Sequence, residues 1–346
     1  MKKLAFLVLA AVFLAATPAQ ASDIVRVEVM SQNLYIGADL GRLLAGEPPA
    51  ALLQTVQQTN FPERAVEIAE AIDDFNPDLL GLQEVSLISV FDAEGNVLLQ
   101  LDYLGILMAA IAAEGENYAV ASSVTNSDVV LPVDPEAGTS ARVVDRDVII
   151  YRTTSTTVSN PQWANFTTNF QVEVFGFPIE FTRGWTAVDA EVGGQSFRFV
   201  NTHLEVEGAP CVVGDVPVIC QDVQAAELAG ELADENLPIV LVGDINAEPG
   251  ATAYETFASG GYTDTWTIRF PYNNEPGFTC CQSEALDNVE SELDERIDHI
   301  FISDDDLDPV FTLTTVVGDW EERKTPGGLW YSDHGGPWAR MYLRFQ

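Results

Sequence analysis

The chain has 346 residues, of which 53 are acidic and 16 are Lys or Arg, so its formal net charge is −37. Hydrophobic residues make up 47% of the chain, which is enough to form a buried core and excludes a disordered protein. The scarcity of cations excludes recognition of nucleic acid by a broad basic surface, because such recognition relies on Lys and Arg to neutralise phosphates. If the chain binds a phosphate, another group must neutralise it.

The N-terminus has the three parts of an export signal. Two lysines follow Met1, an apolar run covers residues 4–16, and a small-residue Ala-Gln-Ala sequence ends at residue 21. The apolar run is too short to span a bilayer comfortably. We therefore predict that residues 1–21 are a signal peptide, that residues 22–346 form a single domain, and that the protein is secreted or periplasmic.

Four cysteines can pair in such an oxidising compartment. Cys211 and Cys220 flank a short loop, which favours a local bridge. Cys280 and Cys281 are adjacent and could form a vicinal bridge or pair elsewhere, so three connectivities remain open. Neither pair has the spacing of a zinc site.

Apolar strand-like and helix-like segments alternate along the chain. The clearest helix is predicted over residues 61–75, where Asn60 can act as the N-cap and Pro62 suits the first turn. A second helix is predicted over about residues 222–235. The strand-like runs cover residues 24–30, 79–85, 147–151, 197–202, 239–243 and 297–302. No linker interrupts this pattern, which favours one large α/β domain with two sheets.

Polar residues interrupt these apolar strands or follow them. Glu84 ends one buried run, where an unpaired charge would be costly. Asp244 and Asn246 follow another run and are two residues apart, so they point to one side of an extended chain. Taken singly, each has a structural interpretation: Glu84 could bind a surface arginine, and His203 could be a hydrogen-bonded core histidine.

The set of polar residues predicts a chemical site more strongly than its members do. Two of the three histidines, His203 and His334, lie at strand ends beside carboxylates. Oxygen ligands without sulfur favour a hard cation such as Mg²⁺. A cation with imidazoles nearby suits phosphoryl chemistry, because the cation neutralises the phosphate, one side chain activates water and another assists the leaving oxygen. The metal would supply the positive charge that the surface lacks.

Six short motifs carry these residues in order. They are Asn33, Leu-Gln-Glu84-Val, Asn-Thr-His203-Leu, Gly-Asp244-Ile-Asn246, Arg-Ile-Asp298-His and Ser-Asp333-His334. Together they resemble the motifs of the endonuclease/exonuclease/phosphatase superfamily. The resemblance implies that residues 22–346 are one catalytic domain with a four-layered α/β sandwich fold, in which two packed mixed β-sheets are flanked by helices and the site lies at the sheet edges.

The resemblance also implies a metal site. Glu84 would bind the essential Mg²⁺, with Mn²⁺ or Ca²⁺ as possible substitutes. Asn33 would assist as a ligand, and Asp333 would act through a water molecule.

The remaining motif residues would carry the reaction. Asp244 and Asn246 would position the attacking water or stabilise the transition state. His334, oriented by Asp298, would be the general base or contact the phosphate, and His203 would steady the phosphate or protonate the leaving oxygen. The sequence does not decide whether Asp244 or His334 takes the proton.

Three departures from the family pattern carry expectations of their own. His299 stands where an aromatic residue is common, which favours a packing role. Residues 335–337, Gly-Gly-Pro, replace a bulky residue and Pro, which predicts a looser final loop. No carboxylate is evident to orient His203, and the candidates are Asp128, Asp145 and Asp147.

We therefore predict a secreted Mg²⁺-dependent phosphoric ester hydrolase, most simply a phosphodiesterase. The family cleaves DNA, RNA, sphingomyelin and inositol phosphates, so the substrate could be a nucleic acid or a phospholipid headgroup. The alternatives are a phosphomonoesterase of the same fold and a catalytically silent binding or toxin-like protein. No obligate protein partner is evident.

Some features favour the lipid branch. Asn33-Leu-Tyr35, the helix start Pro62-Glu63-Arg64-Ala65 and the loop containing Cys211 are similar to secreted bacterial sphingomyelinases. An aromatic loop with Trp320, Trp330 and Tyr331 could make transient contact with a membrane surface, or these residues could simply pack. For the aromatic stretch 163–185, two core strands are favoured over a lipid-inserting hairpin.

Overall fold

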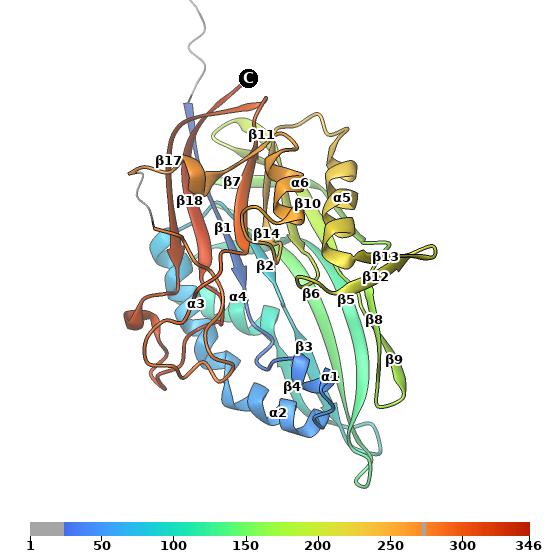
Figure 1. The fold of residues 1–346 in the computed structure, drawn as a ribbon. Coiled ribbons are helices and arrows are strands. Elements are labelled where there is room, and N and C mark those ends of the chain that lie inside the picture. Colours follow the sequence, from blue (N-terminus) through green and yellow to red (C-terminus); the bar gives the residue numbers. More distant parts are fainter. Residues whose placement is uncertain (1–23, 272–274) are drawn as a thin grey trace, which may run out of the picture.

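The computed structural model describes residues 24–271 and 275–346, so the predicted signal peptide lies outside the described residues. Two large β-sheets pack face to face, and helices cover the outer face of each (Figure 1). This arrangement of four layers confirms the predicted fold class.

The first sheet is mixed and has eight strands. Its order is β17-β18-β1-β2-β6-β3-β4, with β5 paired to β6. The strands are β1 (Ile24–Asn33), β2 (Leu79–Gln83), β3 (Leu87–Phe91), β4 (Val97–Asp102), β5 (Tyr118–Asp134), β6 (Thr139–Arg152), β17 (Leu307–Val317) and β18 (Gly336–Phe345).

The second sheet is also mixed and has the order β15-β16-β14-β11-β10-β7. Its strands are β7 (Thr156–Asn165), β10 (Gly184–Val192), β11 (Gln195–His203), β14 (Ile239–Asp244), β15 (Tyr262–Asp264) and β16 (Asp298–Ser303). Two small hairpins stand apart from it, namely β8 (Phe170–Val174) with β9 (Phe177–Phe181), and β12 (Pro210–Val213) with β13 (Val216–Ile219). Each of the six predicted strands falls on an observed strand.

Helices pack on both outer faces. Those on the first sheet are α1 (Gly41–Leu44), α2 (Pro49–Gln58), α3 (Phe61–Phe75) and α4 (Tyr103–Glu114), and those on the second are α5 (Cys220–Leu232) and α6 (Thr252–Ala258). Short 3₁₀ turns are η1 (Thr265–Ile268) and η2 (Glu321–Arg323). Within the described residues, no helix is long and apolar enough to cross a membrane.

Helix α3 matches its predicted bounds and keeps Pro62 in its first turn. Asn60 occupies the N-cap position, but its side chain accepts no hydrogen bond from the backbone N–H groups of the first turn and instead donates to the Glu63 carboxylate. Its left-handed backbone, with φ of 44°, differs from the extended backbone of a side-chain cap. The predicted capping role of Asn60 is therefore wrong.

The strand directions bring the polar strand ends to one edge. β1 runs parallel to β2, with Asn33 opposite Gln83, and β11 runs parallel to β14, with His203 opposite Asp244. β16 runs antiparallel to β14, so its first residue, Asp298, lies at the same edge. The carboxyl ends of parallel strands meet at one sheet edge, which is why residues far apart in the sequence converge here.

The strand leading to Asp244 requires a glycine. A Cβ at Gly243 would overlap the carbonyl oxygen of Thr202 on the neighbouring strand β11. Glycine thus allows β14 to approach β11 closely just before Asp244, because it has no side chain to clash. The position of Asp244 beside His203 depends on this approach.

Of the two alternatives for the aromatic residues near the C-terminus, the membrane loop is contradicted for Trp330 and Tyr331. Trp330 and Tyr331 are buried in the core beneath the first sheet's helices. Trp320 is 38% exposed and packs against Phe75 of α3. Packing, the alternative interpretation, therefore accounts for Trp330 and Tyr331.

The aromatic stretch 163–185 divides between core and surface. Phe166 and Trp185 are buried, as core strands predict. Trp163 is 60% exposed, and Phe175 and Phe177 at the turn of the β8–β9 hairpin are about half exposed. The expectation of core packing is wrong for that hairpin turn, because β8 and β9 pair only with each other and form no part of the main sheets.

The cysteines form two local pairs. Cys211 is bonded to Cys220 across the β12–β13 hairpin, as predicted. Cys280 is bonded to Cys281, so the vicinal alternative is the one observed.

The final loop is tightly packed, so the expectation of a looser loop is wrong. Gly335 and Gly336 are buried. A Cβ at Gly336 would overlap the side chain of Gln32, and one at Gly335 would overlap Val316. The glycines therefore serve close packing next to His334.

Candidate active site

A cleft of about 520 Å³ opens at the edge where the polar strand ends meet. Six of the eight residues predicted to form the site line it, namely Glu84, His203, Asp244, Asn246, Asp333 and His334. Asn33 and Asp298 lie behind this lining, each hydrogen-bonded to a residue that lines the cleft. The structure thus brings all eight residues together.

Asn33 connects the carboxylates of the two sheets. Its Nδ2 donates to Glu84 Oε1 at 3.2 Å and to Asp244 Oδ2 at 3.0 Å. Its Oδ1 accepts from the backbone N–H of Tyr35 at 2.9 Å. Asn33 therefore faces the carboxylates with its NH₂ group, and its oxygen could bind a metal only if the amide turned.

Glu84 is held at both carboxylate oxygens. Its Oε2 accepts from the backbone N–H of Ile36 at 2.6 Å, while Oε1 accepts from Asn33. Burial raises the pKa of Glu84 above its ordinary value, and the nearby Asp145 carboxylate adds to the rise. A negatively charged Glu84 is therefore poorly compensated by the protein alone.

Asp244 lies between the two imidazoles. Its Oδ2 is 3.5 Å from His203 Nε2 and 3.8 Å from His334 Nδ1. Its Oδ1 accepts from the backbone N–H of Asn246 at 2.9 Å. Burial raises the pKa of Asp244 to about 7, and the charge of Asp298 contributes to the rise.

His203 is oriented by an arginine. Arg183 Nη1 lies 3.1 Å from His203 Nδ1. Burial lowers the pKa of His203 well below its ordinary value, and the positive charge of Arg183 adds to the effect. His203 is therefore neutral near pH 7.

His334 is oriented by a carboxylate. Its Nδ1 lies 2.8 Å from Asp298 Oδ2, and its Nε2 is 3.7 Å from Cys280 Sγ. Burial alone would lower the pKa of His334, but the surrounding carboxylates of Asp298, Asp333 and Asp244 raise it well above its ordinary value. The two histidines are thus pushed toward opposite charge states, an arrangement that separates acid and base roles.

Three residues that line the cleft have left-handed backbone. Tyr35, Glu84 and Asn246 all have positive φ, at 57°, 54° and 52°. Left-handed backbone at a residue other than glycine costs about 1–3 kcal/mol and persists where the surrounding structure imposes it. Here the hydrogen bonds of Asn33, Ile36 and Asp244 hold these turns in place.

The donor chemistry of the cleft fits a hard divalent cation. Burial raises the pKa of Glu84, and it raises that of Asp333 to about 7, so both carboxylates lack a compensating charge. Asp298 Oδ1 is buried without a hydrogen-bond partner among the described residues. The donors of Glu84 and Asp333 are oxygens, which suits Mg²⁺, Mn²⁺ or Ca²⁺ better than softer metals.

Sequence reasoning missed Arg183, which lies just before strand β10 and outside any of the six motifs. Of the three carboxylates considered for orienting His203, Asp128 is wrong, since it pairs with Arg142 at the surface. Asp145 and Asp147 do approach His203, with ligand atoms within 4.8 Å of one another. Asp145 and Asp147 are two residues apart on β6, so their side chains lie on the same face of the strand. This spacing was the signal in the sequence that both could approach one residue.

His299 has the packing role expected of it. It is buried, its Nε2 lies 2.9 Å from the Ala247 carbonyl oxygen, and its ring stacks near Phe301. His299 therefore contacts the loop after Asp244 and does not line the cleft.

Comparison with known proteins agrees with this geometry. The model of the Endonuclease/Exonuclease/phosphatase family matches residues 56–334. No curated protein matches the chain.

Solved structures share the fold across nearly the whole chain. An endonuclease/exonuclease/phosphatase family protein from Bacteroides thetaiotaomicron is 17% identical, with a TM-score of 0.57 and coverage of 93% of this chain and 98% of that one. The catalytic domain of human nocturnin with bound sulfate is 18% identical, with a TM-score of 0.54 and coverage of 93% and 95%. A mannosyl-6-phosphatase from Bacteroides thetaiotaomicron is 17% identical, with a TM-score of 0.52 and coverage of 91% and 99%. At these identities the similarity concerns the fold and not the substrate.

Proposed function

The chain belongs to the endonuclease/exonuclease/phosphatase family of metal-dependent phosphoester hydrolases, and from that premise we propose that it is a Mg²⁺-dependent phosphodiesterase. The observation that carries the proposal is the position of Asp244, within 4 Å of two imidazoles and joined through Asn33 to Glu84. In this proposal Asp244 would act as the base, the two histidines would bind the phosphate and Glu84 would bind the metal.

Glu84 and Asp333 are the residues that would hold the cation, with Asn33 fixing the Glu84 carboxylate. Bound Mg²⁺ supplies positive charge that offsets the charge of the phosphate and of the leaving oxygen. Because both carboxylates have raised pKa values through burial, their charged forms gain most from such a partner. The net charge of −37 is compatible with this local source of positive charge.

Asp244 is the better candidate for accepting the proton of the attacking water. Its pKa of about 7 matches that of a base working near neutrality. His334, whose pKa is raised well above its ordinary value, would carry a proton at that pH and donate from Nε2 to a phosphate oxygen. Asn246, hydrogen-bonded to Asp244 through its backbone, would help to position the water.

His203 would donate a hydrogen bond without changing its charge. Arg183 occupies its Nδ1, which leaves the proton on Nε2. From there it would steady a phosphate oxygen or the leaving oxygen. A silent binding protein is less well supported, because the cleft keeps every residue that we propose to bind the metal or transfer a proton.

The test is hydrolysis of bis(4-nitrophenyl) phosphate by the purified protein in Mg²⁺ and then in excess EDTA. We expect turnover that EDTA abolishes and that Mg²⁺ restores. Glu84→Gln and His334→Ala should each lose it, while Glu94→Gln, at an exposed turn, should not. Faster hydrolysis of 4-nitrophenyl phosphate than of the diester would favour the phosphomonoesterase alternative, and no metal-dependent turnover of either would contradict the proposal.

We also propose that residues 1–21 direct export. The Cys211–Cys220 bridge is of the kind that persists in oxidising compartments. Mass spectrometry of the protein recovered from the periplasm or medium should give an N-terminus at Ser22. A cytoplasmic protein that retains Met1 would contradict the proposal.

A further inference from the structure

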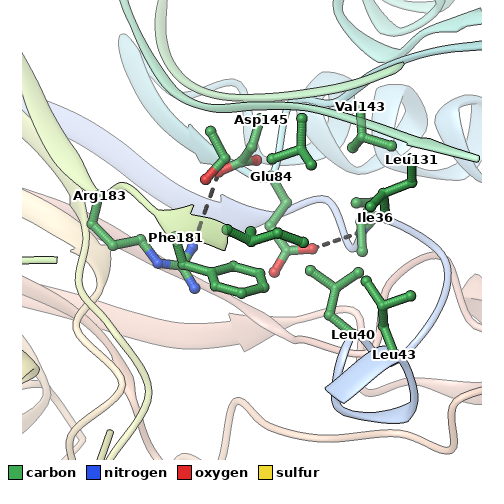
Figure 2. A pocket seen from close by; sticks show the side chains of 12 residues that line it. Ile36, Leu40, Leu43, Glu84, Leu131, Val143, Asp145, Phe181 and Arg183 are labelled. Carbon is green, nitrogen blue, oxygen red and sulfur yellow. Dashed lines mark hydrogen bonds and ion pairs between the residues drawn. The ribbon is translucent and has the colours of Figure 1, made fainter. Parts of the chain in front are cut away.

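An apolar chamber of about 100 Å³ opens directly beside the metal-binding carboxylate. Its lining includes three charged groups: Arg183 pairs with Asp145, and the Glu84 carboxylate accepts from the backbone N–H of Ile36 (Figure 2). Away from them the lining is almost wholly aliphatic, with Ile36, Leu40, Leu43, Leu131, Val143 and Ile179. The neutral polar residue in the lining, Ser127, already accepts a hydrogen bond from the Thr182 backbone.

The chamber adjoins the catalytic cleft. Glu84, Arg183 and Phe181 line both, so a molecule bound at the cleft lies next to the chamber. The chamber also shares Leu131 and Val143 with a second apolar cavity of about 70 Å³, which reaches helix α2. Apolar space therefore extends from beside Glu84 toward the helices.

Such apolar cavities are unusual in a packed core. Protein interiors fill their space closely, and an apolar cavity weakens the fold in proportion to its volume. Apolar cavities of this size remain dry and bind hydrocarbon ligands. The opening of the chamber beside Glu84 therefore indicates a ligand that has an apolar part and a charged part close together.

The lining discriminates among the apolar groups that a phosphoester can carry. A nucleobase would bring several donors and acceptors into a region whose neutral side chains offer a single hydroxyl, that of Ser127, and unpaired buried polar groups are costly. Branched aliphatic side chains suit a flexible hydrocarbon, which has no polar edge to satisfy. Arg183 at the mouth supplies a cation to the phosphate from which the hydrocarbon would extend.

We propose that the chamber binds an aliphatic chain of the substrate, so that this protein acts on phosphoesters bearing a hydrocarbon chain and not on nucleic acid. The proposal rests on the proposed function and specifies its substrate class. Each methylene that enters the chamber should raise affinity about fourfold, the equivalent of about 0.8 kcal/mol for a buried CH₂. The gain in affinity per methylene should stop once the chain fills the apolar space.

The test is isothermal titration of the Mg²⁺-loaded protein with methyl, butyl, hexyl and octyl phosphate, below their micelle concentrations. We expect the association constant to rise with chain length, with an increasingly negative heat-capacity change. Equal affinity for methyl and octyl phosphate would overturn the proposal. Hydrolysis of bis(4-nitrophenyl) phosphate, measured on the same samples, tests the phosphodiesterase function separately, so the two failures are distinguishable.

Neighbouring residues of β5 provide a matched pair of variants. Leu131 lines the chamber, whereas Val130 is 60% exposed on the opposite face of the strand. Leu131→Trp should abolish the gain with chain length and leave methyl phosphate binding unchanged, while Val130→Trp should retain the gain. If Leu131→Trp does not fold, Leu131→Ser should still reduce octyl phosphate affinity at least about tenfold relative to methyl phosphate. A full chain-length gain in a folded Leu131 variant would contradict the proposal.

Discussion

Arg183 donates a hydrogen bond to His203, with Nη1 and Nδ1 3.1 Å apart. A guanidinium has no acceptor, so Nδ1 must be the unprotonated nitrogen of the ring. The proton of neutral His203 then lies on Nε2, which faces Asp244 Oδ2 at 3.5 Å. An arginine thus sets the tautomer of this histidine, a task for which the sequence suggested a carboxylate.

Replacing Arg183 should change the titration of His203. In Arg183→Met the loss of the positive charge should raise the pKa of His203 toward its ordinary value, although burial will still hold it low. We expect kcat/KM to fall about 10- to 100-fold, as when the partner that orients a site histidine is removed. NMR titration of the three histidines would measure the shift. Arg142→Met, which breaks an exposed ion pair, should move neither quantity; an unshifted His203 in Arg183→Met would contradict the assignment.

Removing the carboxylate of Asp298 should lower the pKa of His334, whereas removing Arg183 should raise that of His203. Asp298→Asn removes a charge that raises the pKa of His334, so this pKa should fall. If His334 acts as its cation, activity is lost as pH rises through its pKa, and the alkaline limb of the pH profile should move to lower pH. We expect kcat to fall about 10²- to 10⁴-fold.

The control for this variant is Asp304→Asn, at an exposed turn, which should leave the profile in place. An alkaline limb that moves to higher pH in Asp298→Asn would contradict the assigned charge of His334.

The metal-free protein should lose stability as pH rises. The folded state raises the pKa values of Asp244 and Asp333 to about 7, so between roughly pH 4 and 7 it binds more protons than the unfolded state. The free energy of unfolding in EDTA therefore decreases across this window through these two groups. A bound divalent cation should restore stability, by about 2.7 kcal/mol at a concentration of 100 times its Kd.

Urea unfolding at several pH values, in EDTA and in Mg²⁺, would measure both effects. Other ion pairs also titrate, so the comparison is with Asp244→Asn, whose stability in EDTA should decrease less with rising pH than that of the wild type. Glu84→Gln should lose most of the stabilisation by Mg²⁺. If the free energy of unfolding had the same pH dependence in Asp244→Asn and in the wild type, the raised pKa of Asp244 would be refuted.

Arg64 should be essential for the loops that carry the site. It is fully buried and donates to the carbonyl oxygens of Leu34 and Tyr35, just after Asn33. It also donates to the carbonyl oxygen of Tyr331, just before the Ser-Asp-His motif. Arg64→Met would leave these acceptors buried and unpaired, at about 1–3 kcal/mol each, so we expect a loss of about 3 kcal/mol or more.

Urea unfolding of Arg64→Met, with Arg64→Lys as the control that keeps the charge, would test this role. Lysine has three donors on one nitrogen and lacks the planar fork, so Arg64→Lys should recover only part of the stability. Wild-type stability and activity in Arg64→Met would show that the loops are held by other contacts.

The sequence predicted those parts of the fold that depend on local pattern. The segment after Pro62 has its apolar residues on one face, which is buried, and helix α3 has its predicted bounds. The aromatic residues were harder to place, because Trp330 is in the core and Phe177 at the surface although each has another aromatic residue within two positions in the sequence. Their burial depends on which segment packs over them, and local pattern carries no information about that.

The acidic composition excluded a basic binding surface, and the polar residues beside apolar strands indicated a chemical site. That Glu84, His203, Asp244 and His334 meet at the sheet edges was implied by the resemblance of their motifs to a known family. Parallel strands bring their ends together whatever the loops between them do. Only the tertiary structure decided that Arg183 orients His203 and that an aliphatic chamber opens beside Glu84. Both depend on the register of neighbouring strands and on the packing of side chains from separate segments, which no single stretch of sequence specifies.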